Sequence, residues 1–399
     1  MYKMLDGNAA AVEAMKLARV QVIAAYPITP QSAVAEKLSS LIDNGEMDAQ
    51  YIRVESEHTA MSACVGAALC GVRPATATSS VGLALMHEVL GMAAGNRLPI
   101  VMPVVNRALP SPWSLWCEHG DSMAERDTGW IQFYCQNVQE VLDLTLIAYK
   151  AAENKNVLTP VMVCYDGFFL SHSMQKIDVP DQKDAYAYVG EYVSKNAFLD
   201  TKDPMFVCDL TGPDDWTEIK YQQKVAMDNA FPYIQEAMDE YKKMTGRGYS
   251  IVEEYKTEDA DAVLVAAGSM CGTAKYVVNQ MREQGKKVGL LKLSVFRPFP
   301  AAQIFKALND KKVIGVFDRS AGIGGGGPIW CEVAAQLKGP QIRHFVGGLG
   351  GRDVPAHTIE KIFVQLLEAA GNPSYEHTEW IDLKPNPFEI REVLVNVSH

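Results

Sequence analysis

The sequence predicts an α/β protein of two domains, and three observations support this fold class. The chain has 399 residues, which is long for a single domain. Its first part alternates short apolar runs with helical patterns, as a parallel sheet with helices on both faces requires. A second alternation of this kind begins near Tyr249, so we predict domains at 1–248 and 249–399.

Apolar runs separated by helical patterns define the elements of the first domain. The predicted strands are Val20–Tyr26, Gln50–Val54, Pro74–Thr78, Ile100–Val105 and Val157–Tyr165. The predicted helices are Asn8–Arg19, Gln31–Ile42, His58–Cys70, Val81–Ala94 and Val138–Asn154. Gly71 follows the third helix, and glycine is the usual residue just after a helix C-terminus.

The second half begins with a less regular segment. Residues 171–215 are polar, proline-containing and weakly periodic, which predicts a surface connector or an arm on a partner subunit. A long helical pattern runs from Tyr221 to Met244, with Asp214 or Thr217 as N-cap and Gly246 as its stop. The second domain is then predicted to contain strands Ala262–Ala267, Lys287–Lys292, Lys312–Phe317 and Gln341–Val346 and helices Met270–Gln284 and Ile329–Leu337.

Composition excludes several classes of function. The chain is 48% hydrophobic and 21% charged, as in ordinary soluble globular proteins. It has no apolar run of about eighteen residues, and its first residues lack a signal-peptide core, so a cytoplasmic location without a membrane partner is expected. A net charge of −11 argues against nucleic acid as a ligand.

The eight cysteines do not form a metal or disulfide pattern. No two of them have Cys-x-x-Cys spacing, and most lie in apolar runs. A disulfide framework is not expected in a chain of this size and class. An iron–sulfur cluster needs four thiolates, usually closely spaced, so the chain is expected to carry no cluster.

Three polar side chains follow predicted strands of the first domain, where open α/β sheets bind their ligands. Thr29 lies between Pro27 and Pro30, which restrict the backbone and remove two donors, so its hydroxyl is held on a stiff turn. Glu57 belongs to an acidic run after the second strand, and Arg107 follows the fourth. Each alone could be a turn residue, a helix-terminal carboxylate or a surface arginine; together they indicate a ligand site.

Six segments, in order along nearly the whole chain, carry a family resemblance. They are Tyr26-Pro27-Ile28-Thr29-Pro30, Ser56-Glu57-His58-Thr59-Ala60, Asn106-Arg107-Ala108-Leu109, Asp121 through Asp127-Thr128-Gly129-Trp130, Phe296-Arg297-Pro298-Phe299 and Gly347-Gly348-Leu349-Gly350-Gly351-Arg352-Asp353. The chain resembles the α subunit, the pyrimidine-side half, of the thiamine-diphosphate-dependent 2-oxoacid:ferredoxin oxidoreductases, most closely the multi-subunit pyruvate:ferredoxin oxidoreductases. The resemblance implies a thiamine-diphosphate-binding pyrimidine domain followed by a domain similar to the C-terminal domain of transketolase.

The resemblance also implies roles for four residues. Glu57 would bond to the pyrimidine N1′ of thiamine diphosphate and so activate the cofactor, with Glu55 as the competing carboxylate. Arg107 would bind the substrate carboxylate through paired donors. Thr29 would bond to the substrate beside the cofactor, or cap the helix that follows it, or do both. Ser80, in a small-residue loop, would lie at the cofactor.

One motif of thiamine enzymes is missing from the chain. The diphosphate is held through Mg²⁺ by Gly-Asp-Gly with a later asparagine, and neither Gly120-Asp121-Ser122 nor Tyr165-Asp166-Gly167 matches. The resemblance therefore implies that no metal binds here and that a β subunit supplies the diphosphate site, Mg²⁺ and the nearest iron–sulfur cluster. A γ subunit and a ferredoxin-like δ subunit are expected too. Ferredoxin is usually acidic and would be repelled by this chain, so we expect it to dock on a partner.

The segment 110–121 contains two prolines and two tryptophans and predicts a stiff roof that keeps water from the substrate. Within it, His119 and Asp121 are either polar groups of the pocket or hydrogen-bonded structural residues, and the structural role is favoured for His119. Cys117 has no base at a readable spacing and is rejected as a nucleophile. The glycine-rich run 322–327 lacks the pattern of a phosphate loop and predicts a tight packing turn.

The function implied is that of one subunit of an enzyme. With its partners it would catalyse the reversible, coenzyme A-dependent oxidative decarboxylation of pyruvate to acetyl-CoA and CO₂, with ferredoxin as the electron acceptor. The alternatives are the same chemistry on branched-chain 2-oxoacids or 2-oxoglutarate, or a non-catalytic scaffold subunit. Thr29 argues against oxalate, because the related oxalate enzyme has a bulkier basic residue in this turn.

Overall fold

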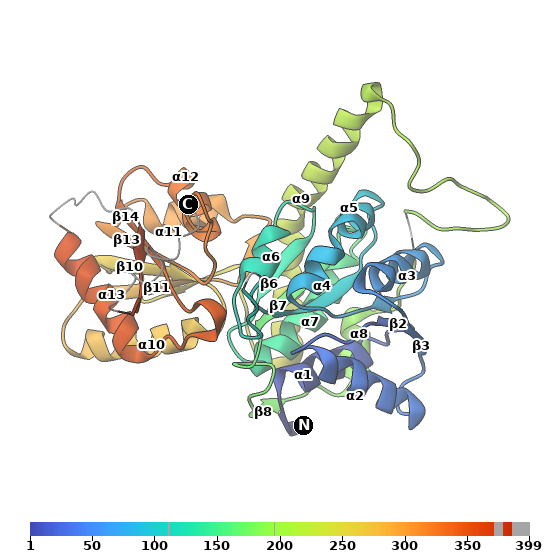
Figure 1. Cartoon of the computed structure of the whole chain (residues 1–399), viewed down its shortest axis with the longest axis horizontal. Helices are drawn as coiled ribbons and strands as arrows, with labels where there is room; N and C mark the ends of the chain where they lie inside the picture. The colour runs from blue at the N-terminus through green and yellow to red at the C-terminus, as the bar shows by residue number, and fades with distance from the viewer. Residues whose placement is uncertain (111, 195, 371–377, 385–399) are drawn as a thin grey trace, which may run out of the picture.

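The computed structural model describes residues 1–110, 112–194, 196–370 and 378–384, and two large sheets lie side by side in it (Figure 1). The first sheet has the strand order β12-β6-β7-β5-β4-β2-β3. Its strands are β2 (Val22–Ala25), β3 (Gln50–Arg53), β4 (Pro74–Ala75), β5 (Val101–Asn106), β6 (Ile131–Tyr134), β7 (Val161–Asp166) and β12 (Val295–Arg297). All of its pairs are parallel except β12 with β6.

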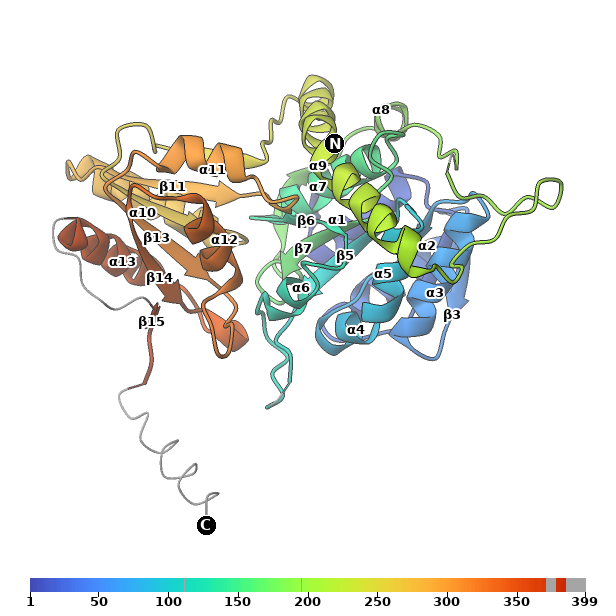
Figure 2. The same cartoon turned by 90° about the horizontal axis from the view of Figure 1, so that it is seen from above.

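Helices cover both faces of the first sheet, which confirms the predicted α/β fold (Figure 2). One face packs against α1 (Gly7–Leu17), α2 (Ser32–Asp43) and α7 (Val138–Ala152). The other face packs against α3 (Glu57–Leu69), α4 (Ser80–Leu85) and α5 (His87–Gly95), with α6 (Gly120–Ala124) beside them. A single helix over Val81–Ala94 was expected, but the helix is interrupted at Met86, between α4 and α5.

The N-terminal strand β1 (Tyr2–Leu5) pairs antiparallel with β8 (Gln175–Asp178), and the sequence analysis predicted neither strand. The predicted connector 171–215 is therefore structured at its start, and it also contains α8 (Gln182–Val189). Helix α8 packs on the body, since the Tyr188 hydroxyl donates to the Ala237 carbonyl at 2.8 Å. Between α8 and residue 212, the described residues 190–194 and 196–212 form no helix or strand, and residues 213–215 already belong to the helix that follows.

The long helix α9 (Pro213–Thr245) starts earlier than predicted. Pro213 occupies the first helical position, which suits a residue without a backbone donor. The prediction of Asp214 or Thr217 as N-cap is wrong, because Gly212 is the N-cap. Asp214 and Asp215 lie in the first turn instead, where their negative charges stabilise the helix N-terminus. Gly246 ends the helix in the left-handed conformation, with φ of 78°, as predicted.

The second sheet has the order β15-β14-β13-β10-β11-β9, parallel except for β9 with β11. Its strands are β9 (Val252–Tyr255), β10 (Ala262–Ala266), β11 (Val288–Leu293), β13 (Val313–Asp318), β14 (Gln341–Val346) and β15 (Thr378–Trp380). The helices are α10 (Met270–Glu283), α11 (Ala301–Leu308), α12 (Pro328–Gln336) and α13 (Ala356–Ala369), with α10 and α13 packed together and α11 against α12. The four predicted strands and both predicted helices are confirmed.

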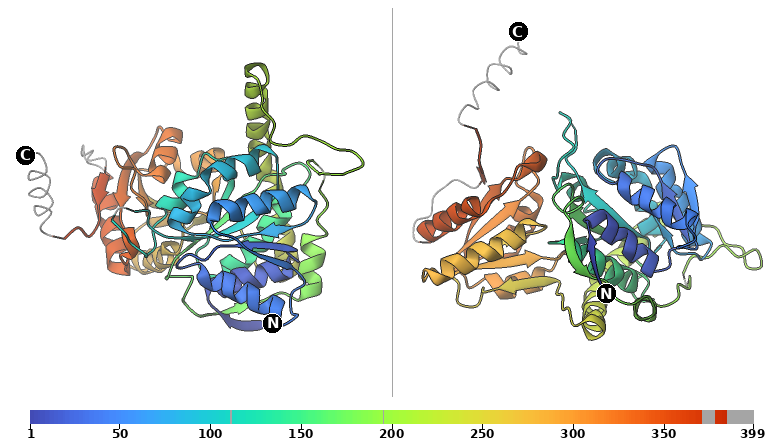
Figure 3. Two further views of the ribbon diagram at one scale, coloured as in Figure 1. Left: turned by 45° about the vertical axis from the view of Figure 1, so that its right-hand side comes forward. Right: turned by 90° about the horizontal axis from the view of Figure 1, so that it is seen from below.

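The two sheets are joined by more than the connection between α9 and β9 (Figure 3). Strand β12 follows β11 of the second sheet along the chain but pairs with β6 of the first sheet, with Val295 opposite Phe133. Buried apolar side chains of both sheets form one continuous cluster. The predicted boundary near residue 248 lies between α9 and β9. It stays a prediction, because β12 comes after this boundary in the chain and yet belongs to the first sheet.

The glycine-rich run 322–327 is a packing turn, as predicted. Gly326 lies so close to the Trp330 ring that a Cβ would sit 2.2 Å from it. The N-terminal amides of α12 are already used, because Ile329 and Trp330 donate to the Asp318 carboxylate at 2.9 and 3.0 Å. A phosphate would have to displace that carboxylate.

Candidate functional site

The predicted site residues lie beyond the carboxyl ends of β2, β3, β4 and β5, which are consecutive neighbours in the first sheet. After β2 the chain moves to β3 on one side, whereas after β4 it moves to β5 on the other. The strand order thus reverses between β2 and β4, and open α/β sheets form their ligand crevice at such a point. Thr29 follows β2 there, and Ser80 follows β4.

Glu57 is the first residue of α3, and the local sequence turns its side chain inward. Ser56 is the N-cap and accepts the Thr59 amide at 3.2 Å. Glu57 is only 6% exposed, whereas Glu55 is exposed and accepts the Thr59 hydroxyl at 2.6 Å. A helix N-terminus stabilises a carboxylate. Glu57, and not Glu55, is therefore the buried carboxylate of this segment.

The Glu57 carboxylate lies against the start of α4. A Cβ built on Gly82 would sit 2.5 Å from Glu57 Oε1 and 2.5 Å from Thr78 Oγ1, so glycine alone leaves room there. The Thr78 hydroxyl is fully buried and has no hydrogen-bond partner among the described residues. A buried, unsatisfied hydroxyl is costly and calls for a partner that the chain itself does not supply. The sequence analysis missed Thr78, although it ends a predicted strand at the ligand edge.

Gly82→Ala should reduce turnover of the assembled enzyme at least tenfold while costing about 1–3 kcal/mol of stability, as small overpacking does. The new methyl group would collide with Glu57 and Thr78, and the longer side chain of Glu57 has more rotatable bonds through which its carboxylate can be displaced. Steady-state kinetics and thermal unfolding measure the two effects. Gly66→Ala in α3 is the matched control, since a Cβ at Gly66 meets nothing within 4 Å. Full activity in Gly82→Ala would show that the position of the Glu57 carboxylate is unimportant.

Ser80 opens α4 with a left-handed backbone, φ of 50°, which is strained for a residue other than glycine. Its hydroxyl donates to the Ala108 carbonyl at 2.6 Å, and its amide donates to Asp121 Oδ2 at 2.9 Å. The side chain is fully buried and is held by the loop after β5. Ser80 therefore fixes the first turn of α4 beside Glu57, and contact with a cofactor stays a prediction.

Asp121 joins the segments of the site into one unit. Its carboxylate accepts the amides of Ser80, Arg107 and Ser122 at 2.9, 3.0 and 2.8 Å, and the Asn106 side chain at 2.8 Å. Burial raises the pKa of Asp121, and these donors oppose that effect. Four donors already satisfy its oxygens, so Asp121 has a structural role: it holds together the segments that follow β4 and β5.

Arg107 and Thr29 are in direct contact. The Arg107 Nη1 donates to the Thr29 carbonyl at 2.8 Å, and Nε donates to the Ser114 carbonyl at 3.3 Å. Arg107 is 3% exposed and forms no ion pair with any carboxylate in the described part of the chain. Burial lowers its pKa, and the nearby Asp121 opposes this in part. A buried guanidinium without a counter-ion favours an anionic ligand.

The predicted roof differs from expectation. Trp113 and Trp116 are 70% and 52% exposed, so these side chains do not close a pocket within this chain. Ser111 lies outside the described residues. The far end of the roof rests on the turn after β14 of the second sheet, where the Gly351 amide donates to the Cys117 carbonyl at 2.8 Å. Large exposed aromatic side chains are typical of surfaces at which protein chains meet.

Cys117 and His119, at the end of the roof segment, lie close to Asp166. The possible metal-ligand atoms of these three residues are within 4.8 Å of one another. His119 Nε2 is 2.8 Å from Asp166 Oδ1, so His119 is hydrogen-bonded and buried, as the favoured structural role requires, and that role stays a prediction. Asp166 also pairs with Arg319 of the second domain; burial raises its pKa, but Arg319 and His119 outweigh this and hold it well below the usual range. A cation would compete with that guanidinium. Burial raises the pKa of the Cys117 thiol, consistent with its rejection as a nucleophile.

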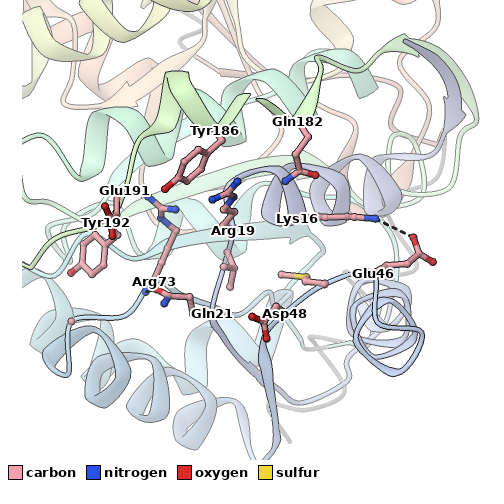
Figure 4. Close-up of a pocket in the computed structure, with 13 residues that line it drawn as sticks. Lys16, Arg19, Gln21, Glu46, Asp48, Arg73, Gln182, Tyr186, Glu191 and Tyr192 are labelled. Atoms are coloured by element: carbon pink, nitrogen blue, oxygen red, sulfur yellow. Dashed lines mark hydrogen bonds and ion pairs between the residues drawn. The ribbon is translucent and has the colours of Figure 1, made fainter. Parts of the chain in front are cut away.

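A cavity of about 600 Å³ lies on the other side of the first sheet from the site, at the amino ends of its strands (Figure 4). Gln21 and Arg73, which line it, precede β2 and β4, so it opens at the amino ends of these strands. Lys16 pairs with Glu46 at 3.1 Å, and the Arg19 guanidinium carbon lies 3.4 Å from the centre of the Tyr186 ring. None of the predicted site residues lines this cavity.

No described helix is both long enough and apolar enough to cross a bilayer.

Comparison with known proteins finds that two protein-family models match consecutive parts of the chain. A model described as "Pyruvate flavodoxin/ferredoxin oxidoreductase, thiamine diP-bdg" matches residues 13–239. A second, "Pyruvate:ferredoxin oxidoreductase core domain II", matches residues 260–359.

Individual relatives match almost end to end. The pyruvate synthase subunit PorA of Methanothermobacter thermautotrophicus is 46% identical over 383 residues, covering 96% of this chain and 98% of that protein. The ketoisovalerate oxidoreductase subunit VorA of Pyrococcus abyssi is 42% identical, covering 96% of this chain and 98% of its own. A solved structure of 2-oxoglutarate:ferredoxin oxidoreductase from Magnetococcus marinus, with 2-oxoglutarate, coenzyme A and succinyl-CoA bound, has a TM-score of 0.73 at 22% identity, covering 92% of this chain and 65% of that chain.

Proposed function

The chain belongs to the 2-oxoacid:ferredoxin oxidoreductase family, and from this membership we propose that it is the α subunit of a pyruvate:ferredoxin oxidoreductase. With partner subunits it would catalyse the reversible, coenzyme A-dependent oxidative decarboxylation of pyruvate to acetyl-CoA and CO₂, passing electrons to ferredoxin. The observation that carries the proposal is that two buried charged groups, the carboxylate of Glu57 and the guanidinium of Arg107, both lie beyond the carboxyl ends of the strands of the first sheet.

The residues present fit the pyrimidine ring of thiamine diphosphate. Glu57 has no hydrogen-bond donor among the described residues, and the Thr78 hydroxyl beside it is buried without a partner. A ring that carries both a protonated nitrogen and an amino group would satisfy such an acceptor and hydroxyl. When bound, thiamine diphosphate supplies the carbon nucleophile for attack on the keto group. Glu57, Thr29 and Ser80 are the proposed cofactor contacts of this chain.

Glu57 would hold a proton at the pyrimidine N1′. Its carboxylate is preorganised by the N-terminus of α3 and by the tight contact with Gly82, so it would stabilise positive charge there without reorganisation. Because the side chain is nearly excluded from water, this charge interaction would be stronger than in solution. Glu57 is thus the proposed catalytic residue.

Arg107 and Thr29 would orient the 2-oxoacid. The guanidinium would bind the substrate carboxylate by paired hydrogen bonds, which a lysine cannot reproduce. Its bond to the Thr29 carbonyl would hold the threonine turn, so that the Thr29 hydroxyl can reach the substrate. Orientation of this kind lowers the entropic part of the barrier.

The remaining parts of the enzyme are proposed to come from partners. The two aspartates nearest to a Gly-Asp-Gly pattern are Asp121 and Asp166, and their carboxylates already accept several protein donors. We therefore assign the diphosphate site, Mg²⁺ and the nearest cluster to a β subunit, with γ and ferredoxin-like δ subunits and external ferredoxin completing electron transfer. Coenzyme A is a substrate of the whole complex, and the proposed location is the cytoplasm.

A branched-chain 2-oxoacid is the second candidate substrate, because the VorA relative is nearly as similar as the PorA relative. The test is reduction of ferredoxin or viologen by the purified complex with pyruvate, 2-oxoisovalerate, 2-oxoglutarate and oxalate. The proposal expects the highest kcat/KM for pyruvate. A higher value for 2-oxoisovalerate would make a branched-chain 2-oxoacid the assigned substrate. If the complex reduced neither ferredoxin nor viologen with any of these acids, the remaining interpretation of this chain would be a non-catalytic scaffold.

A further inference from the structure

An acidic, apolar arm projects from the first domain. The arm comprises residues 198–218, from the loop before α9 to the first turns of that helix (Figure 1). It extends from the body near α3 and joins the end of α9 that stands clear of both sheets, as the left view of Figure 3 also shows. The reaction proposed above uses none of its residues.

The apolar side chains of the arm face solvent although the backbone is anchored. Phe206 and Leu210 are 93% and 96% exposed. Between them, Val207 packs on the core and the Cys208 amide donates to Asn96 Oδ1 at 3.4 Å. Nearby, the Leu199 amide donates to the Leu69 carbonyl at 2.8 Å. These contacts hold the backbone of the arm in place, while the side chains of Phe206 and Leu210 remain exposed to solvent.

The arm also carries much of the charge of the chain. It contains six acidic residues and one lysine, a net charge of −5 out of −11 for the whole protein; the acidic residues are Asp200, Asp203, Asp209, Asp214, Asp215 and Glu218. None of these six forms an ion pair with a described residue. The N-terminus of α9 explains Asp214 and Asp215, which lie in its first turn. It does not explain the others.

We propose that the arm docks on a different subunit of the complex, in an apolar groove edged by lysine or arginine side chains. Large aromatic side chains bury about 150–250 Å² each, and a stable interface takes about 800 Å² from each partner. Phe206, Leu210 and Trp216 of the arm, together with Tyr221 further along α9, are all at least half exposed and could supply most of that area. A second copy of this acidic chain would be repelled, and so would an anionic membrane.

The inference depends on this chain having partner subunits, as proposed above, but not on its chemistry. The first test places a photoreactive p-benzoylphenylalanine at position 206 in the co-purified complex. After irradiation, mass spectrometry identifies the adduct. An adduct to a different subunit, close to lysines or arginines, supports the proposal. An adduct to a second copy or to this chain itself overturns it, and so does an intact complex that gives no adduct.

The second test measures affinity. Phe206→Ser with Leu210→Ser should weaken binding of the partner at least tenfold, and Asp203→Lys with Asp209→Lys should weaken it and reduce its salt dependence. Both doubles should melt like the wild type, because the side chains are exposed. Phe305→Ser is the matched control, a 48% exposed apolar side chain on α11. Unchanged affinity overturns the inference, whereas wild-type complex that assembles but reduces nothing contradicts only the proposed function.

Discussion

Glu57→Gln should abolish most turnover of the assembled enzyme and leave the fold intact. The amide keeps the shape of the side chain but cannot stabilise a proton at the pyrimidine N1′. Removing one preorganised charge of this kind costs about 3 kcal/mol or more, which corresponds to a loss of roughly a hundredfold in kcat. The measurement is steady-state ferredoxin or viologen reduction with saturating pyruvate, together with thermal unfolding.

Glu55→Gln is the matched control for this experiment. It removes a carboxylate from the same segment, but the Glu55 side chain is exposed and, among the described residues, bonds only to Thr59. Activity close to wild type is expected. If instead Glu57→Gln stayed within a few-fold of wild type and Glu55→Gln did not, the assignment of the two carboxylates would be reversed.

Arg107→Lys should lower kcat/KM for pyruvate although the charge is kept. Lysine cannot donate to the Thr29 carbonyl and to a substrate carboxylate with the geometry of the guanidinium. Loss of one charge-assisted contact costs on the order of 2–3 kcal/mol, roughly thirty- to a hundredfold in kcat/KM. The effect should be similar for every 2-oxoacid, because all carry the same carboxylate, and thiamine diphosphate binding should change little.

Arg97→Lys separates this effect from a general loss of structure. Arg97 also donates to backbone carbonyls, those of Val157 and Leu158, but lies at the other edge of the first sheet. That variant should lose stability without a change in the pyruvate KM. An unchanged pyruvate KM in Arg107→Ala would mean that the carboxylate is held elsewhere, most simply by Thr29 with donors from the partner.

The positions of the catalytic candidates could be predicted because they depend on local sequence. Parallel strands end at one edge, so Thr29 and Arg107, each just after an apolar run, had to lie near one another. Ser56 followed by a helical pattern indicated an N-cap, and this places Glu57 at the start of a helix. The family motifs then distinguished these residues from ordinary turn and surface residues.

Features that depend on long-range packing could not be predicted. No pattern around Thr78 shows that its hydroxyl would face Glu57 across Gly82, because α3 and α4 meet only in the folded domain. Strand β12 is three residues long, and its pairing with β6 joins segments more than 150 residues apart. The exposure of Trp113 and Trp116 likewise depends on the path of their loop over the folded chain, which the local sequence does not show.

The central claim is that this chain supplies only the pyrimidine side of a shared thiamine diphosphate site. Its most direct test is the affinity for thiamine diphosphate with Mg²⁺, measured for this chain alone, for the β subunit alone and for the two together. We expect weak binding by this chain alone and tight, Mg²⁺-dependent binding by the pair, lost when the Glu57→Gln variant replaces the wild-type chain. Tight, Mg²⁺-dependent binding by this chain alone would contradict it.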